Sequence, residues 1–213
     1  MYTDRVSVRE PILDLSWEVR GYEILTDRNV ILGNREFIFS NLPEFLDLIL
    51  FEIHSEEAKK ESKDIFVNIR PQTLVAFKGR LSRFISPNLV VEIREDHADV
   101  EILRSIGELK DKTGLRICVD DFGTGSSNIE RLLLLKPDFV KLDMRVFSPL
   151  PYACRKLVLK NLVDAIRTMT DAVVIFEKVE KLEDLEIASE VGADLWQGFL
   201  SRYKLQGMYY FYC

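Results

Sequence analysis

Histidine and cysteine, which supply many zinc ligands and nucleophiles, are scarce in this chain of 213 residues. There are two histidines, His54 and His97, and three cysteines, Cys118, Cys154 and Cys213. No two cysteines have the C-x-x-C spacing of a zinc site, and an odd, scattered set supports no disulfide framework. Cys118 lies in an apolar run, which favours a buried thiol.

An excess of positive charge and long apolar runs are also lacking. With 29 Lys and Arg against 35 Asp and Glu, the net charge is −6, so the chain has no basic footprint for polymeric nucleic acid. No apolar run approaches the length of a membrane span, and residues 1–5 show no signal-peptide pattern. We expect a cytoplasmic protein with no membrane partner. The 47% apolar content is ample for one core, and we expect a single domain over residues 1–213.

Short apolar runs recur along the chain, with helical patterns between them. The predicted strands are 6–15, 19–25, 65–69, 89–93, 115–119, 139–142, 172–176 and 194–196, and the predicted helices are 37–60, 99–112, 126–135, 154–169 and 182–191. The first two strands are close together and indicate an antiparallel pair. The later strands, most of which are separated by helical patterns, imply parallel strands with right-handed crossovers. Eight strands favour a closed α/β barrel, with an open doubly wound sheet as the alternative.

Two details of the helices follow from the pattern. In the helix at 37–60, we expect Phe45, Leu48, Ile49 and Ile53 to share one face. Gly114 is well placed to end the helix at 99–112, because glycine adopts the left-handed conformation at that position.

Asp120 and Asp121 stand between an apolar run and a glycine turn at Phe122 to Gly125. An unpaired buried carboxylate is costly, so two in succession need a cation, either lysine or a divalent metal. The Gly-x-Gly of the turn is a weak phosphate-loop signal, since the longer dinucleotide fingerprint is absent.

Polar side chains close most of the predicted strands. They are Glu23, Asn68, Glu92 with Glu95 just beyond, Asp120 and Asp121, Lys141 and Asp143, Glu177 and Gln197. A barrel brings these strand ends to one rim. One lysine cannot compensate so many carboxylates, so we expect one or two divalent ions, and all-oxygen ligands favour Mg²⁺ or Mn²⁺. Neither histidine lies at a strand end, which disfavours a histidine base.

Each of these residues alone also has a structural interpretation. The alternatives are an edge-strand glutamate at Glu23, turn residues at Asn68 and Gln197, solvated glutamates at Glu92 and Glu95, and a Lys141 that only pairs with Asp120. Their occurrence at seven strand ends of one chain favours a site.

The ordered set of motifs resembles the EAL family, bacterial phosphodiesterases of cyclic di-GMP. The segments that carry the resemblance are Glu23-Ile24-Leu25, Val67-Asn68-Ile69-Arg70-Pro71, Glu92-Ile93-Arg94-Glu95, Asp120-Asp121-Phe122-Gly123-Thr124-Gly125, Lys141-Leu142-Asp143, Glu177-Lys178-Val179-Glu180 and Gln197-Gly198-Phe199. The resemblance implies a modified (β/α)₈ TIM-like barrel with an antiparallel first strand, which agrees with the hairpin expected above. It implies a metal-dependent hydrolase that converts cyclic di-GMP to linear pGpG.

Roles for individual residues also come from the resemblance. It implies a first metal held by Glu23, Asn68, Glu92 and Asp120, with Asp120 bridging to a second metal served by Asp121 and Glu177. It assigns catalytic roles to Lys141, which would orient or deprotonate the attacking water, to Glu95, which would tether the Asp-Asp loop, and to Gln197, which would position water or ligands. The expected substrate-binding residues are Leu25, Arg28 and Asp143.

The chain departs from the family pattern at three positions that bear on substrate binding. Glu10 stands where glutamine usually precedes Pro11, Asp27 stands where arginine usually follows the Glu-x-Leu motif, and Lys178 stands where glycine is usual. These departures favour a second hypothesis, a catalytically weak or silent EAL-like module that binds cyclic di-GMP or a protein partner. A third, another metal-dependent barrel hydrolase, stays open.

The helix after the Asp-Asp loop suggests self-association. Leu132, Leu133, Leu134 and Leu135 make that helix apolar on more than one face, and EAL proteins often dimerise through it. A homodimer is therefore expected.

Overall fold

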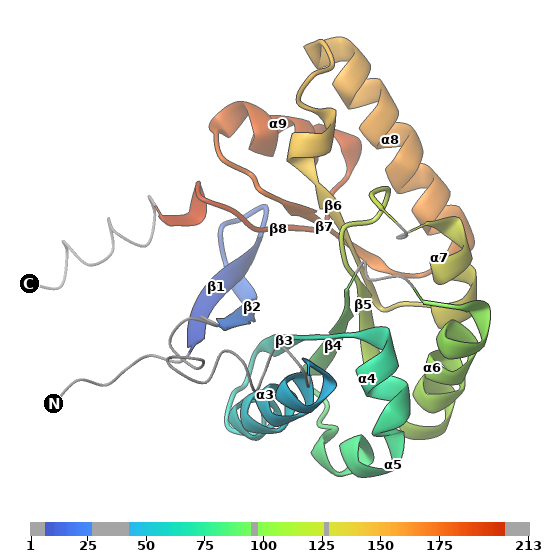
Figure 1. Ribbon diagram of the computed structural model, residues 1–213. Helices are drawn as coiled ribbons and strands as arrows, with labels where there is room; N and C mark the ends of the chain where they lie inside the picture. Colours follow the sequence, from blue (N-terminus) through green and yellow to red (C-terminus); the bar gives the residue numbers. More distant parts are fainter. Residues whose placement is uncertain (1–6, 27–42, 95–97, 126–127, 203–213) are drawn as a thin grey trace, which may run out of the picture.

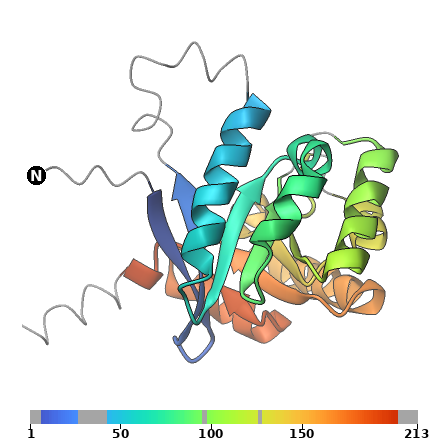
Figure 2. The same cartoon turned by 90° about the horizontal axis from the view of Figure 1, so that it is seen from below.

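The computed structural model describes residues 7–26, 43–94, 98–125 and 128–202. Their strands form a closed barrel in the order β1 to β8, with the helices outside it (Figures 1 and 2). β1 runs antiparallel to both of its neighbours, β2 and β8, whereas the other neighbouring strands are parallel. This confirms the modified barrel and excludes the open sheet.

The element bounds agree closely with the predicted ones. The strands are β1 (Ser7–Asp14), β2 (Val19–Thr26), β3 (Asp64–Ile69), β4 (Leu89–Ile93), β5 (Arg116–Val119), β6 (Phe139–Asp143), β7 (Val173–Glu177) and β8 (Leu195–Trp196). The helices are α3 (Pro43–Ala58), α4 (Pro71–Ala76), α5 (Lys78–Leu81), α6 (Val100–Thr113), α7 (Ile129–Leu135), α8 (Tyr152–Met169) and α9 (Leu182–Val191), with 3₁₀ turns η2 (Ser82–Phe84) and η3 (Met144–Phe147).

Local sequence signals set several helix ends. Gly114 ends α6 with a φ of 71°, as predicted, and Gly192 ends α9 in the same way with a φ of 90°. Asn128 begins α7, where its side chain accepts a hydrogen bond from the backbone N–H of Glu130. The α7 start therefore lies three residues after the one predicted at Ser126, a residue outside the described part of the chain.

The prediction for α3 was partly wrong. The helix ends at Ala58, not at Lys60, and residues 37–42 lie outside the described residues. Phe45 and Ile53 are exposed, whereas Leu48, Phe51 and Ala58 are buried. The spacing of these three buried residues, three and seven apart, is that of a helix face, so the core-facing stripe is rotated from the predicted one.

The helices α4 and α5 between β3 and β4 were not predicted. Pro71 closely follows Asn68, for which a turn was one interpretation, but it occupies the first turn of α4, where its missing N–H has no intrahelical partner to lose. Both helices are too short for their apolar periodicity to be recognised in the sequence.

The barrel interior contains an apolar layer to which most strands contribute one side chain. Its buried members are Ile12, Phe66, Val90, Cys118, Phe139 and Ile175. Phe66 and Phe139 pack edge to face with ring centroids 5.0 Å apart. A Cβ on Gly21 would come within 2.7 Å of the carbonyl oxygen of Asp64 and within 3.2 Å of the Phe66 ring, so this glycine leaves room for the neighbouring strand and for the ring. The expected burial of the Cys118 thiol is confirmed.

The second, larger apolar cluster fills the space between the strands and the surrounding helices. It holds the helices against the barrel and so fixes the strand ends from which the polar residues project. Within the described part of the chain, no helix has both the length and the apolar character needed to cross a bilayer.

Candidate metal-binding active site

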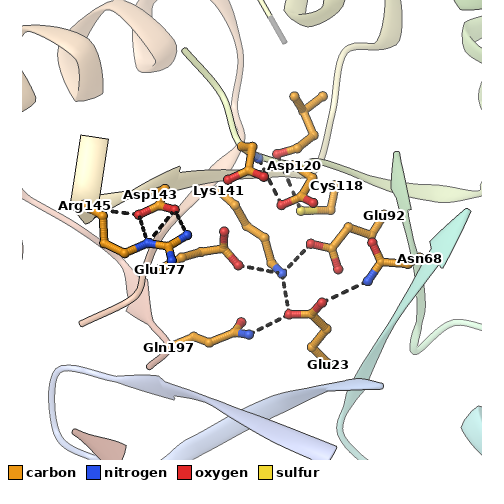
Figure 3. Close-up of polar contacts among 12 residues, drawn as sticks. Glu23, Asn68, Glu92, Cys118, Asp120, Lys141, Asp143, Arg145, Glu177 and Gln197 are labelled. Carbon is orange, nitrogen blue, oxygen red and sulfur yellow. Dashed lines mark hydrogen bonds and ion pairs between the residues drawn. The ribbon is translucent and has the colours of Figure 1, made fainter. Parts of the chain in front are cut away.

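A polar layer lies directly above the apolar layer, toward the C-terminal ends of the parallel strands. Successive side chains of a strand point to opposite faces, so residues two apart point the same way. On each strand from β2 to β8, the residue two positions after the apolar level is polar. The apolar level is formed by Gly21, Phe66, Val90, Cys118, Phe139, Ile175 and Leu195, and the residues two positions later are Glu23, Asn68, Glu92, Asp120, Lys141, Glu177 and Gln197. These seven predicted strand-end residues, all labelled in Figure 3, are therefore brought together inside the barrel mouth.

Lys141 lies at the centre of this polar layer (Figure 3). Its Nζ is 2.8 Å from Oε2 of Glu23 and 3.0 Å from Oε1 of Glu177, and it also contacts Glu92. All four side chains are buried. The solvated interpretation of Glu92 and the edge-strand interpretation of Glu23 are thereby excluded, and Lys141 does more than pair with Asp120.

Two amide side chains fix the orientation of Glu23. Asn68 donates a hydrogen bond from Nδ2 to Oε1 of Glu23 at 2.8 Å, and Gln197 donates from Nε2 to Oε2 at 2.5 Å. Because an amide donates through nitrogen, its oxygen is left to face the interior of the site. Gln197 Oε1 is buried and accepts no hydrogen bond from any described residue.

The polar layer has the donor set of a divalent cation site. Glu23, Glu92 and Glu177 can each bring an oxygen within 4.8 Å of the others, and so can Asp120, Asp121 and Glu177. Oε2 of Glu92 is buried without a hydrogen-bond partner among the described residues, which is costly unless a cation occupies the space beside it. All donors are oxygens, which suit hard cations such as Mg²⁺ and Mn²⁺. The residues therefore fit the expected metal.

The crowding of carboxylates changes their protonation. Burial raises the pKa of Glu177 to about 7 and that of Asp120 to about 6, although the charge of Lys141 opposes both increases. Burial and the charge of Glu23 raise the pKa of Glu92 well above its usual value. Burial also acts against ionised Glu23, but the charge and hydrogen bond of Lys141 and the two amides lower its pKa overall. A bound cation would relieve this crowding.

The loop after β5 carries the adjacent carboxylates. Asp121 has a φ of 47°, in the left-handed region, and its N–H donates to Oδ1 of Asp120 at 2.9 Å. The N–H of Phe122 donates to the carbonyl oxygen of Lys141 at 2.9 Å, which attaches the loop to β6. Thr124 closes the turn on the carbonyl oxygen of Asp121. These bonds hold both carboxylates toward the barrel mouth.

Asp143 has a partner that the sequence analysis missed. It is buried at the end of β6, where Arg145 donates two hydrogen bonds to its carboxylate, from Nε at 3.1 Å and from Nη2 at 2.5 Å. The i, i+2 spacing across a strand end could have indicated this pair. The substrate-binding role of Asp143 stays a prediction.

A cavity of about 310 Å³ opens beside the first group of predicted ligands. Its wall includes Glu23, Leu25, Asn68 and Asp120, so the predicted substrate contact Leu25 lies at the site. Arg28, predicted to bind substrate, and Glu95, predicted to tether the loop, lie outside the described residues.

The cavity wall also includes Asp47, His54 and Arg94, which the sequence analysis did not assign. The spacing of Asp47, Leu50 and His54 places one face of α3 against the cavity. Arg94 follows Glu92 by two residues, a spacing that could have indicated a shared direction. Burial lowers the pKa of His54, which favours the neutral imidazole.

Comparison with known proteins matches residues 36–202 to the EAL domain. This match begins after Glu23, so the assignment of Glu23 depends on its place in the barrel. A curated relative is the probable cyclic di-GMP phosphodiesterase PdeA of Escherichia coli, 31% identical over 74% of this chain and 23% of that protein. Another is the cyclic di-GMP phosphodiesterase TpdA of Vibrio parahaemolyticus, 28% identical over 52% of this chain and 20% of that protein. The chain thus spans less than a quarter of the length of these relatives.

Solved structures have the same fold. The EAL domain protein of Listeria monocytogenes superimposes with a TM-score of 0.76 at 19% identity, covering 97% of this chain and 92% of that one. A Klebsiella pneumoniae protein, solved with manganese and cyclic di-GMP, gives a TM-score of 0.72 at 18% identity, covering 91% of this chain and 54% of that one. With the family match, the closed barrel and the polar layer at its mouth, this chain belongs to the EAL domain family.

Proposed function

We propose that this protein is a metal-dependent phosphodiesterase that hydrolyses cyclic di-GMP to linear pGpG. The observation that carries the proposal is the buried polar layer, in which two carboxylate clusters share Glu177 and surround Lys141. Relatives named as cyclic di-GMP phosphodiesterases support the choice of substrate.

Magnesium or manganese would be held by the donors already described. Glu23, Asn68, Glu92 and Asp120 would hold one ion, and Asp120, Asp121 and Glu177 would hold a second. A divalent cation at such a site lowers the pKa of a coordinated water and neutralises charge that develops on the attacked phosphodiester.

The protein groups would then position the reactants. Lys141 Nζ lies at the centre of the layer, where it donates to Oε2 of Glu23, so we assign it to orienting the attacking water and holding negative charge there. Asn68 and Gln197 keep Glu23 in one orientation through their amide hydrogen bonds. Burial of the layer strengthens each of these interactions by excluding bulk water.

The substrate would occupy the cavity beside Glu23 and Asp120, against Leu25. We propose Arg28 and Asp143 as further substrate contacts and Glu95 as the tether of the Asp120–Gly125 loop, as the family resemblance implies. A cytoplasmic location, expected from the sequence, stays a prediction.

The test is incubation of purified protein with cyclic di-GMP and Mn²⁺, with chromatographic separation of the products. The matched control is Glu23→Gln, which keeps the size of the side chain and removes its charge. We expect pGpG from the wild type and at least about 100-fold less from the variant, because loss of a ligand should exceed the 10–100-fold effect of a supporting residue. Equal product from both proteins would refute the assignment of the site.

One observation favours the alternative of a silent binding module. Glu10 lies opposite Glu23 in the β1–β2 register. Directly opposed like charges on a sheet disfavour one another, so Glu10 disfavours the ionised form of Glu23 that would hold a cation. In that case the folded wild type would bind cyclic di-GMP but form no pGpG with either Mn²⁺ or Mg²⁺, and Glu10→Gln would be the variant to examine next.

A further inference from the structure

A second cavity of about 370 Å³ lies between the segments that follow β6 and β7. Its wall includes four cationic side chains, Arg145, Arg155, Lys178 and Lys181. Three of them have carboxylate partners. These pairs join Arg145 to Asp143, Arg155 to Asp184 and Glu183, and Lys181 to Glu183.

Lys178 differs from the other three cations of this wall. No carboxylate oxygen of the described residues lies within ion-pair distance of its Nζ, and the side chain is only half-buried. Glu180 also lines the cavity, but it forms no ion pair with Lys178. Lys178 is therefore the wall cation that an incoming anion can reach without breaking an existing pair.

The backbone places Lys178 beside the carboxylate clusters. It follows Glu177, the last residue of β7 and a member of both clusters. Its φ of 55° lies in the left-handed region, which a side chain with a Cβ seldom occupies. Its ammonium is close enough to Glu177 to act electrostatically on that carboxylate.

We propose that Lys178 binds a phosphate oxygen of the nucleotide on the Asp121 side of the metal site. This inference rests on the proposed function, since it assumes that a cyclic dinucleotide phosphate contacts the cluster of Asp120, Asp121 and Glu177. A phosphate held at this cluster would lie next to Lys178, which follows Glu177 in the chain. Lysine binds phosphate as a point charge and needs no fixed geometry, which suits a half-buried side chain.

The test measures the Kd of cyclic di-GMP by calorimetry in Ca²⁺, at two salt concentrations, for wild type, Lys178→Met and Lys178→Arg. We expect Lys178→Met to bind about 10-fold more weakly, the effect of one charged hydrogen bond, and to depend less on salt. Lys178→Arg should bind within about 3-fold of wild type, because the charge is kept. Wild-type affinity and wild-type salt dependence in a folded Lys178→Met would overturn the proposal.

The matched control is Lys136→Met. Lys136 has a similar φ of 43° but lies at the end of α7 next to the N-terminal end of β6. The Lys136→Met variant removes a lysine of left-handed backbone conformation without removing a charge from the site. The Kd of this variant for cyclic di-GMP should therefore equal that of wild type. An equal loss in Lys136→Met and Lys178→Met would overturn the proposal.

Failure of the proposed function would have a different signature. If folded wild type does not bind cyclic di-GMP, the substrate assignment fails, and inorganic phosphate becomes the probe, with Mn²⁺ present. Weaker phosphate binding by Lys178→Met than by Lys136→Met would still support an anion site at Lys178. Equal phosphate binding by these variants and the wild type would overturn it.

Discussion

The two layers of the barrel interior come from the same strands but have opposite chemistry. The apolar layer, in which Phe66 and Phe139 pack edge to face, is complete without any ligand. The polar layer, two residues further along each parallel strand, holds carboxylates around Lys141. Two residues along a strand therefore separate the apolar layer, which stabilises the fold, from the polar layer, whose burial destabilises the fold unless cations are present.

The difference has a physical origin in solvation. Burial of apolar side chains contributes about 25 cal/mol per Å² removed from water, with no requirement for a partner. Burial of carboxylates is unfavourable, and Lys141 offsets only part of it, as the raised pKa values of Glu92 and Glu177 indicate. Stability of the polar layer should therefore depend on cations, and that of the apolar layer should not.

The largest expected effect is that of Lys141→Met. Removal of the central cation leaves three buried glutamates uncompensated, so we expect a loss of about 3–5 kcal/mol in the free energy of unfolding of the metal-free protein at pH 8. Mn²⁺ should restore a large part of this loss. Urea denaturation with and without Mn²⁺ measures both values.

The control for that variant is Lys160→Met, which removes an exposed i, i+4 pair with Asp164. It should change stability by less than about 0.5 kcal/mol, with or without Mn²⁺. A metal-free Lys141→Met as stable as Lys160→Met would contradict the role given to Lys141.

Phe66→Ala should show the opposite dependence on metal. Removal of a buried ring next to Phe139 should cost about 3–4 kcal/mol in unfolding free energy through lost burial and a residual cavity. The same denaturation experiment should give the same loss with and without Mn²⁺. If Mn²⁺ restored Phe66→Ala as well as Lys141→Met, the two layers would not be energetically distinct.

Asn68→Ala tests the support of Glu23. The variant loses the 2.8 Å hydrogen bond to Oε1 of Glu23 and one proposed ligand oxygen. We expect a decrease of about 10–100-fold in kcat/KM for cyclic di-GMP, the usual range for residues that orient a metal ligand. Unchanged steady-state kinetics at limiting Mn²⁺ would exclude this role.

The pH dependence of stability tests Glu177. Its pKa of about 7 in the folded protein lies above the ordinary value of 4.5, so its contribution to stability falls as pH rises from about 4.5 through 7. Glu177→Gln lacks this titration, and its melting temperature relative to the metal-free wild type should increase between pH 5 and 8. A difference that stays constant or falls over that range would show that the pKa is not raised.

The smallest effect on stability is expected from Leu133→Glu on α7. Leu133 is exposed, as is Ile129 one turn earlier, whereas Leu132 and Leu135 are buried. If the expected homodimer forms through this surface, the variant should have a monomer mass in light scattering at a concentration where wild type is dimeric. Identical masses would exclude this surface as the interface.

Much of the site could be predicted because the barrel converts strand position into spatial position. The polar ends of β2 to β8, such as Glu92 and Gln197, meet at one rim once the strands close. Contributions from helices were missed, since neither His54 nor Asp47 on α3 is near a strand in the sequence. The short helix α4 was missed because Pro71 has the same sequence signal at a turn and at a helix start.

The central claim is that the polar layer, to which Glu92 contributes a buried carboxylate, is a divalent cation site. The most direct measurement is a calorimetric titration of metal-free protein with Mn²⁺, in two buffers of different ionisation enthalpy, for wild type and Glu92→Gln. We predict binding with proton release by wild type, because its raised-pKa carboxyls must ionise, and at least about 10-fold weaker binding by the variant. Absence of Mn²⁺ binding by the folded wild type, or equal binding by both proteins, would contradict the claim.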